Sequence, residues 1–523
     1  MHRKHAPRNI LVFLLITIVT SLLIPVSAWA DIRLPAVVGD NMVLQSGMKA
    51  PLWGWADPGE EVRLSVNWHR MERRTSADKD GKWMFEIKSP PVGGPYQIRL
   101  KGKNTIALKN ILVGEVWVCS GQSNMQWSVQ NSNNAKEEIA AAKYPKVRLF
   151  SVERKVADTP QTDCKGRWVE CNPETIPGFS AVGYYFGRHL HKELNVPIGL
   201  IHTSWGGTPA EAWTSPAMLK TIPECEPILK RWKDAVANYP KAMTKYKEAV
   251  EKWKKDSAKA KADGKKAPRR PWAPFGPGHP HSPSGLYNAM IAPLIPYGIQ
   301  GAIWYQGESN ASRAYQYRKL FPAMIKSWRK SWEQNCFPFL FVQLANFRDV
   351  KEEPAESDWA ELREAQTMTL DLDNTGMAVI IDIGEAKDIH PRNKQDVGKR
   401  LAVWALGTTY GWDIVHSGPL YKSMEIKGGA AVLSFDHVGK GLVAKGGAAL
   451  KGFAIAGEDK KFVWAKAEVK GKTIVVSSDE VANPVAVRYA WADNPPCPLR
   501  NAEGLPASPF RTDDWPGITD GKD

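Results

Sequence analysis

The stretch EVWVCSGQSNMQW, residues 115–127, joins an apolar run to a polar turn in which Ser123 lies between two amide side chains. A near-continuous apolar run of this length is typical of a strand buried inside a parallel sheet. Five further runs of the same kind follow along the chain: VRLFSV (147–152), IGLIHTSW (198–205), QGAIWYQG (300–307), FPFLFVQLA (337–345) and GMAVIIDIG (376–384).

Amphipathic segments separate these apolar runs. They are SAVGYYFGRHLHKEL (180–194), YRKLFPAMIKSWRKSW (317–332), WAELREAQTMTL (359–370) and KQDVGKRLAVWALGTTYG (394–411). Strands that alternate with helices indicate a parallel sheet with helices on both faces. Residues 112–415 are therefore predicted to form an α/β domain, and in such domains the functional groups gather at the carboxyl ends of the strands.

Both ends of the mature chain have a different pattern. Residues 31–111 contain short runs that alternate between apolar and polar residues, with turn residues such as Asp57-Pro58-Gly59 between them, and residues 416–523 look similar. This pattern predicts antiparallel, β-sandwich-like regions on either side of the α/β domain. The clearest alternating stretches are EVRLSVNW (61–68), KWMFEIK (82–88), AAVLSFDH (430–437) and PVAVRYAW (484–491).

A Lys-rich insertion interrupts the α/β domain at about residues 225–285. Its apolar residues recur at steps of four and three, which predicts a helix with a single apolar stripe; they are Tyr239, Met243, Tyr246, Val250 and Trp253. We expect this stripe to dock on the domain while the charged face stays in solvent; the alternative is a basic arm for an acidic partner. A Pro- and Gly-rich segment, residues 267–285, follows as an extended loop.

The net charge of +15 is concentrated in that insertion. Residues 241–270 hold ten lysines and two arginines against four acidic residues, so the rest of the chain is far less basic. A basic excess confined to one segment does not support nucleic-acid binding. The hydrophobic content of 43% suits large packed cores and excludes a disordered chain.

The first thirty residues resemble a secretory signal peptide. Arg3, Lys4 and Arg8 precede an apolar stretch over residues 10–24, and Ala28-Trp29-Ala30 supplies small residues at a cleavage site. We therefore expect a mature protein that starts at Asp31 and is secreted or periplasmic, with no membrane attachment after cleavage. An uncleaved membrane anchor is the alternative.

Ser123 at the end of the first strand is a candidate nucleophile. A serine hydroxyl becomes nucleophilic only beside a base that is itself oriented by a third group. GQSNM lacks the second glycine of the GxSxG turn found in many α/β-hydrolases. Taken alone, the motif fits a serine in a polar turn better than it fits a nucleophile.

Three other strand ends carry matching groups. Trp205-Gly206-Gly207 follows one strand, QGESN (306–310) follows another, and the last strand leads to Asp388 and His390. These loops supply backbone donors, amides, an acid and a base on one predicted edge of the sheet. His202, near the second loop, is either another base or a histidine buried in its strand.

The set GQSNM, WGG, WYQGESN and DIHP resembles the sialate O-acetylesterase family, a group of SGNH-type carbohydrate O-acetylesterases. The resemblance extends to PSGLYNAMIAPL (283–294) and RYAWADNP (488–495), and so covers most of the mature chain. It implies a three-layer α/β/α domain of the SGNH-hydrolase type and a serine ester hydrolase.

The resemblance assigns catalytic roles to three residues. It implies that Ser123 is the nucleophile, that His390 is the general base and later the acid, and that Asp388 orients His390. Many SGNH enzymes place the acid three residues before the histidine, where this chain has Lys387. Asp382 is therefore the alternative to Asp388.

The same resemblance implies how the oxyanion of the reaction would be bound. The backbone N–H groups of Ser123 and Gly206 would donate to it, together with an amide side chain from Gln306 or Asn310. Glu308 would act either as a supporting group or as a contact to the substrate.

The expected partner is an acetylated carbohydrate, either O-acetylated sialic acid or an acetylated plant or algal polysaccharide such as xylan or xyloglucan. No cofactor is expected for this chemistry, and no metal is expected at His279 and His281, which have no acid or cysteine near them. A non-catalytic carbohydrate-binding protein is the competing class, and the oligomeric state stays open.

Overall fold

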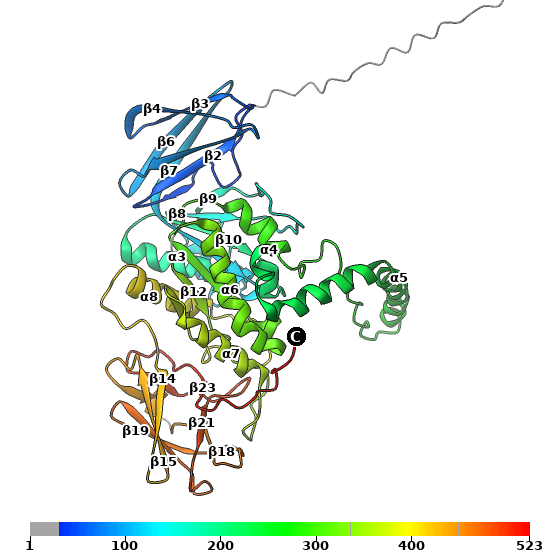
Figure 1. The fold of residues 1–523 in the computed structure, drawn as a ribbon, viewed down its shortest axis with the longest axis vertical. Helices are drawn as coiled ribbons and strands as arrows, with labels where there is room; N and C mark the ends of the chain where they lie inside the picture. The colour runs from blue at the N-terminus through cyan, green and yellow to red at the C-terminus, as the bar shows by residue number, and fades with distance from the viewer. Residues whose placement is uncertain (1–30, 335, 448) are drawn as a thin grey trace, which may run out of the picture.

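One long strand, β7 (Thr105–Gly121), runs through two parts of the molecule (Figure 1). Its first half pairs with β6 (Gly93–Lys101) in the N-terminal β-rich region, and its second half, from Glu115 onward, pairs within the central sheet. The boundary predicted at residue 111 therefore falls inside this strand. The structure is a computed structural model that describes residues 31–334, 336–447 and 449–523, so the predicted signal peptide lies outside the described residues.

The central sheet has the strand order β13-β12-β11-β7-β10-β8-β9. All neighbouring strands are parallel except the last pair. The strands are β8 (Tyr144–Ser151), β9 (Trp168–Cys171), β10 (Ile198–Ser204), β11 (Gly301–Tyr305), β12 (Phe339–Val342) and β13 (Thr375–Ala378). Each predicted strand is present, but β13, the edge strand that pairs only with β12, stops at Ala378 and is shorter than predicted.

Four helices pack beside this sheet in two pairs. The pair α3 (Ala181–Leu194) and α8 (Lys394–Trp404) is in contact, as is the pair α6 (Ala314–Trp332) and α7 (Asp358–Met368). The side chain of Asn393 caps α8 by accepting the backbone N–H of Asp396. This cap fixes the start of α8 close to the loop that carries His390.

Antiparallel sheets flank the central domain at both ends (Figure 1). The N-terminal strands are β1 (Val43–Gln45), β2 (Lys49–Trp55), β3 (Glu61–Val66), β4 (His69–Ser76) and β5 (Lys82–Lys88), besides β6 and β7. The main C-terminal strands are β14 (Leu420–Lys427), β15 (Ala430–Asp436), β17 (Phe453–Ala456), β19 (Lys466–Lys470), β20 (Thr473–Ser477) and β21 (Ala486–Tyr489). The prediction of an α/β fold with a mostly parallel sheet and flanking β-rich regions is confirmed.

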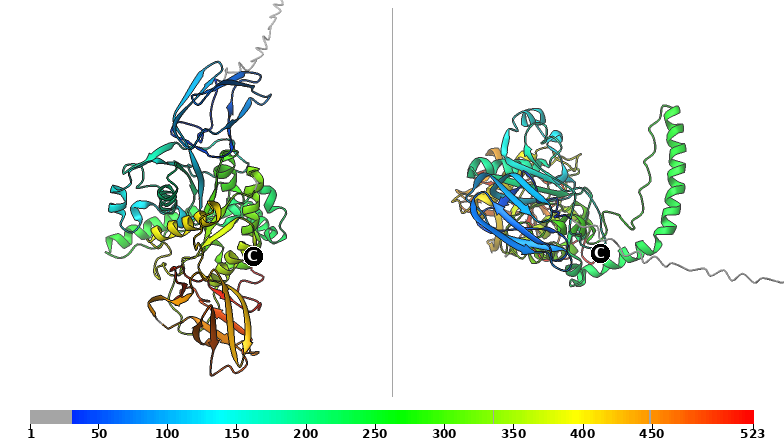
Figure 2. Two further views of the ribbon diagram at one scale, coloured as in Figure 1. Left: turned by 90° about the vertical axis from the view of Figure 1, so that its left-hand side faces the viewer. Right: turned by 90° about the horizontal axis from the view of Figure 1, so that it is seen from above.

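The Lys-rich insertion forms the helix α5 (Glu226–Ala262), which projects away from the domain (Figure 2). The helix bends within its length (Figure 2), and Pro240 inside it lacks the backbone N–H donor of a regular helical turn. The apolar stripe does not dock on the domain as predicted, because the following loop covers it. Trp253 Nε1 donates to Pro268 O at 2.8 Å, and Gly276 lies against the Tyr239 ring.

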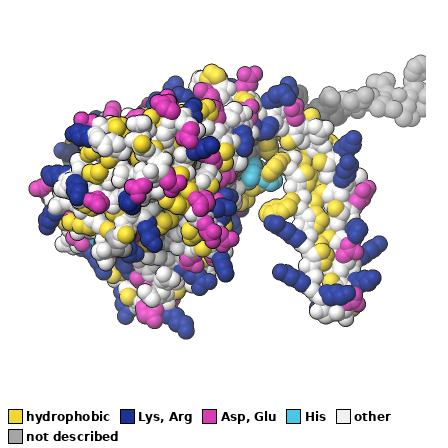
Figure 3. Space-filling view, turned by 90° about the horizontal axis from the view of Figure 1, so that it is seen from below, with side chains coloured by type: hydrophobic (Ala, Val, Ile, Leu, Met, Phe, Trp, Pro, Cys, Tyr) yellow, Lys and Arg dark blue, Asp and Glu magenta, His cyan; other side chains and the backbone are white. Residues whose placement is uncertain are grey.

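The helix α5 and the loop that follows it, residues 226–285, form an arm. Basic side chains line the edges of this arm, with apolar side chains between them (Figure 3). The arm thus carries much of the positive charge of the chain away from the central sheet. Across the part of the chain that the structure describes, no helix combines the length and the apolar character needed to cross a membrane.

Candidate active site

Ser123 lies where β7 turns into the short helix α1 (Ser123–Gln126). Gly121 makes this turn with a φ of 139°, and a Cβ atom at this position would collide with Tyr305 O in the neighbouring strand. Only glycine meets both conditions. As the first residue of the helix, Ser123 has a backbone N–H without a partner inside the helix.

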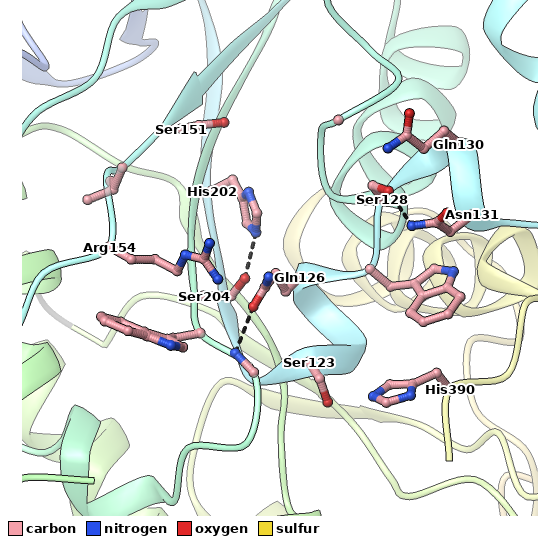
Figure 4. A pocket seen from close by; sticks show the side chains of 15 residues that line it. Ser123, Gln126, Ser128, Gln130, Asn131, Ser151, Arg154, His202, Ser204 and His390 are labelled. Carbon is pink, nitrogen blue, oxygen red and sulfur yellow. Dashed lines mark hydrogen bonds between the residues drawn. The ribbon is translucent and has the colours of Figure 1, made fainter. Parts of the chain in front are cut away.

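A pocket of about 640 Å³ opens beside Ser123 (Figure 4). The predicted residues Ser123, Gly206 and His390 all line this pocket, and the Ser123 side chain lies next to the His390 ring. Most other lining side chains carry an amide, a hydroxyl or an indole: Gln126, Trp127, Ser128, Gln130, Asn131, Ser151, Ser204 and Trp205. Such a lining suits a ligand rich in hydroxyl groups.

Asp388 contacts His390 from the loop before α8. The Nδ1 atom of His390 lies 3.4 Å from Asp388 Oδ1, and the backbone N–H of His390 donates to the same oxygen at 2.9 Å. A carboxylate beside Nδ1 favours the tautomer with its proton on that nitrogen. Nε2 is then the ring nitrogen left to accept the proton of Ser123.

The surroundings of His390 favour its neutral form. Trp127 stacks on the imidazole with ring centroids 5.2 Å apart and an interplanar angle of 13°. Burial lowers the pKa of His390, and the positive charge of Lys394 lowers it further, against the opposing effect of Asp388. A neutral imidazole is the form that can act as a general base.

Asp382, the alternative acid, has other partners. Arg400 donates to both of its carboxylate oxygens, at 2.6 and 2.9 Å, and Arg500 donates at 3.2 Å. Burial alone would raise the pKa of Asp382, but the two arginines outweigh it and the pKa is lowered. Asp382 does not line the Ser123 pocket. The structure therefore places Asp388, and not Asp382, beside His390.

Gly206 approaches Ser123 closely, as a backbone donor must. A Cβ atom on Gly206 would lie 3.2 Å from Ser123 Cβ, which is tighter than an ordinary contact. Its N–H donates to Gln126 Oε1 at 2.7 Å. An oxyanion at this position would have to replace Gln126 Oε1 as the acceptor of the Gly206 N–H.

Gln306 and Asn310 do not line the pocket; both lie in a buried hydrogen-bond network. Gln306 donates to Asn310 Oδ1 at 2.7 Å and accepts from Tyr317 Oη at 3.0 Å. Asn310 in turn donates to Glu211 Oε2 at 3.0 Å. Because both amides form their hydrogen bonds here, this structure gives no support to their predicted part in binding the oxyanion, which stays a prediction.

Glu308 contacts the residue after the nucleophile and does not line the pocket. Its Oε1 atom accepts from Asn124 Nδ2 at 2.6 Å, and burial raises its pKa. Glu308 can support the Ser123 turn from this position through Asn124, and its role stays a prediction.

A second serine and histidine pair lies in the same pocket. His202 Nε2 is 2.6 Å from Ser204 Oγ, and both residues project from β10 (Figure 4). Burial lowers the pKa of His202 to about 4, with a further contribution from Arg154. Such a weak base is poorly suited to deprotonate a serine. His202 therefore holds Ser204 in place and does not contact Ser123.

The residues of the site that were not predicted from the sequence include Gln126, Trp127, Arg154 and Lys394. Arg154 follows a predicted strand, so the rule that functional groups gather at strand ends would have found it. The other three show no distinct pattern in the sequence. Their roles depend on which side chains the fold brings to the Ser123 turn.

Comparisons with known proteins agree with this geometry. Residues 113–264 and 263–406 match the family described as carbohydrate esterase, sialic acid-specific acetylesterase. The chain is 30% identical over 559 residues to the sialate O-acetylesterase of Homo sapiens, covering 96% of this chain and 98% of the relative. It is 31% identical over 535 residues to that of Rattus norvegicus, covering 91% and 94%.

A solved structure shows the same similarity in three dimensions. The crystal structure of a carbohydrate acetylesterase from Xanthomonas citri superposes with a TM-score of 0.78 at 37% identity, covering 93% of this chain and all of that one. The predicted resemblance is thus confirmed. This chain belongs to the carbohydrate esterase family of sialic acid-specific acetylesterases and is an ester hydrolase.

Proposed function

We propose that this esterase removes acetyl groups from sugar hydroxyls by acyl transfer through Ser123, His390 and Asp388. The observation that carries the proposal is the pocket itself. The Ser123 side chain lies next to the His390 ring inside it, and Asp388 contacts the Nδ1 atom of that ring. A serine, a base and a group that orients the base are the parts this chemistry requires.

In the proposed reaction, Ser123 Oγ attacks the acetyl carbonyl carbon while His390 Nε2 accepts the hydroxyl proton. The backbone N–H groups of Ser123 and Gly206 donate to the resulting oxyanion, and Gln126 releases the Gly206 N–H. Collapse of this intermediate breaks the bond to the sugar oxygen, which takes the proton from His390. Water then attacks the acetyl-enzyme with His390 again as the base, releasing acetate and restoring Ser123.

The finer features of the fold and the location of the enzyme are part of the same proposal. A three-layer SGNH arrangement would have α3 and α8 on one face of the sheet and α6 and α7 on the other, which the two helix pairs support. Secretion or export to the periplasm is supported by the signal-like residues 1–30, which precede the described part of the chain.

Arg154 favours an anionic sugar, such as an O-acetylated sialic acid, as the substrate. It is the one residue with a fixed charge among the described residues that line the pocket, and its guanidinium lies 5.6 Å from the centre of the Trp205 ring. Arginine is well suited to bind a carboxylate through paired N–H donors. Neutral plant polysaccharides are the alternative, since nothing in the pocket repels an uncharged sugar.

Acetate release from a panel of acetylated sialosides, xylan and xyloglucan tests this function. We expect hydrolysis of the sialosides, and R154M is expected to lower kcat/KM for them by about tenfold while leaving the neutral substrates unchanged. K155M, which removes the neighbouring exposed lysine, is the matched control. Equal loss on neutral and anionic substrates would contradict the role of Arg154, and no acetate from any sugar ester would contradict the function.

The pH dependence of kcat/KM is expected to reflect the lowered pKa of His390. The base must be neutral to act, so activity rises as the pH rises through the pKa of His390. Because burial and Lys394 lower that pKa, the acidic limb should lie below the ordinary histidine value of about 6.5. A profile of kcat/KM from pH 4 to 8 measures it, and a limb above 6.5 would contradict the described surroundings of His390.

Separate substitutions of the two aspartates distinguish their roles. D388N is expected to lower kcat by up to about 10⁴-fold, because an amide does not hold the imidazole in the productive tautomer. D382N is expected to act on stability instead, since it breaks a buried ion pair at a cost of about 3–5 kcal/mol. Rate measurements and thermal unfolding of both variants suffice, and the reverse pattern would make Asp382 the triad acid.

A further inference from the structure

Asn124, the residue after the nucleophile, connects three separate parts of the site. Its Nδ2 atom donates to Glu308 Oε1 at 2.6 Å and to Ile389 O at 3.0 Å. Its Oδ1 atom accepts from Lys394 Nζ at 2.5 Å. Ile389 directly precedes His390, so this one buried side chain joins the Ser123 turn to the backbone of the His390 loop.

Lys394 is an unusual residue to find behind this turn, because it is fully buried. Its ammonium lies 5.3 Å from the centre of the Tyr305 ring and 5.9 Å from that of Trp127, which stacks on His390. A lysine is almost never fully buried unless it is paired. Here its bonded partner is Asn124, and Glu308 is the acidic group with the largest electrostatic effect on it.

Glu308 completes the arrangement from the other side of Asn124. One of its carboxylate oxygens binds Asn124, and the other is buried without a hydrogen-bond partner among the described residues. Lysine and glutamate thus bind opposite ends of the same amide, which fixes the orientation of the Asn124 side chain. A fully satisfied amide held between two charges is a rigid connection.

We propose that Lys394 is a positioning residue for ester hydrolysis. Through Asn124 it holds the Ser123 turn and the His390 loop in a fixed relative position, and it places a positive charge near His390. The inference rests on the proposed roles of Ser123 and His390. Lys394 itself touches neither the substrate nor the reacting atoms.

The charge of Lys394 gives this role a signature that packing alone would not produce. The titratable groups that act on Lys394 are Glu308, Asp388 and Glu385, with His390 nearby. Burial lowers the pKa of Lys394 to about 7, against the effect of these three carboxylates. In its charged form Lys394 disfavours protonated His390, so its removal should raise the pKa of His390.

The test is the variant K394M, which keeps the length of the side chain without its charge. We expect kcat to fall by about 10- to 100-fold with KM almost unchanged, and the acidic limb of kcat/KM to move to higher pH. K399M, at an exposed position of the same helix, is the control and should behave as the wild type. Wild-type kcat together with an unmoved acidic limb in K394M would overturn the inference.

Two further variants test the proposal if the K394M protein does not fold. N124A keeps the lysine but removes the connection, and it should also lower kcat; unchanged kcat would overturn the proposal. The double variant K394M/E308Q leaves no unpaired buried carboxylate, so its loss in kcat should be smaller than the product of the two single losses. Activity that survives in S123A would instead refute the proposed function. Failure of the proposed function can therefore be told apart from failure of the inference about Lys394.

Discussion

Replacing Ser123 with alanine is expected to lower kcat for acetyl-ester hydrolysis by at least about 10⁴-fold. The variant has no oxygen to form the acyl-enzyme, and water in the pocket lacks the position that the turn after β7 gives to Ser123. The measurement is acetate or p-nitrophenol release under saturating substrate. The fold should be preserved, because alanine keeps the Ser123 Cβ atom that lies next to Gly206.

The serine of the second pair provides the control for this prediction. S204A removes the hydroxyl that His202 holds, and we expect a far smaller loss from it. If S123A turned over near the wild-type rate and S204A were inactive, the nucleophile would be Ser204 on β10 and not Ser123.

His390 should be almost as important as Ser123. H390A removes the base that accepts the serine proton and returns it to the leaving sugar, so kcat is expected to fall by about 10⁴-fold or more. Because the two residues act as a unit, the double variant S123A/H390A should be no slower than S123A alone. Rates of the two single variants and the double variant, measured on one substrate, test this.

The outcome that would contradict this role is a double variant whose losses multiply, since independent contributions would show that the two residues do not act together. H202A gives a further comparison. It removes the other histidine of the pocket and should cost much less, because burial leaves that imidazole too weak a base.

The central fold could be predicted from the sequence because its signals are local and strong. Runs such as residues 115–121 are mostly apolar, and the structure buries this segment completely. The sequence did not predict the packing of elements whose position depends on contacts between residues far apart in the chain. The stripe from Tyr239 to Trp253 correctly predicted a helix, but not that a proline-rich loop would cover it instead of the domain.

Site residues that directly follow a strand could be predicted from the sequence. Site residues that only tertiary packing brings together could not. Ser123, Gly206 and His390 come to one pocket because their strands are parallel neighbours or lead into the same edge of the sheet. Gln306 and Asn310 also follow a strand, but their side chains turn into a buried network. Lys394 gave no signal, because burial of a lysine depends on partners that are distant in the sequence.

Labelling with a serine-directed fluorophosphonate, followed by peptide mass spectrometry, tests the central claim most directly. An activated serine attacks the phosphorus, displaces fluoride and retains the phosphonyl group. We predict one adduct per chain, on Ser123, with loss of esterase activity in proportion to labelling and almost no adduct in H390A. An adduct on Ser204, or full activity in a chain labelled at Ser123, would contradict the account.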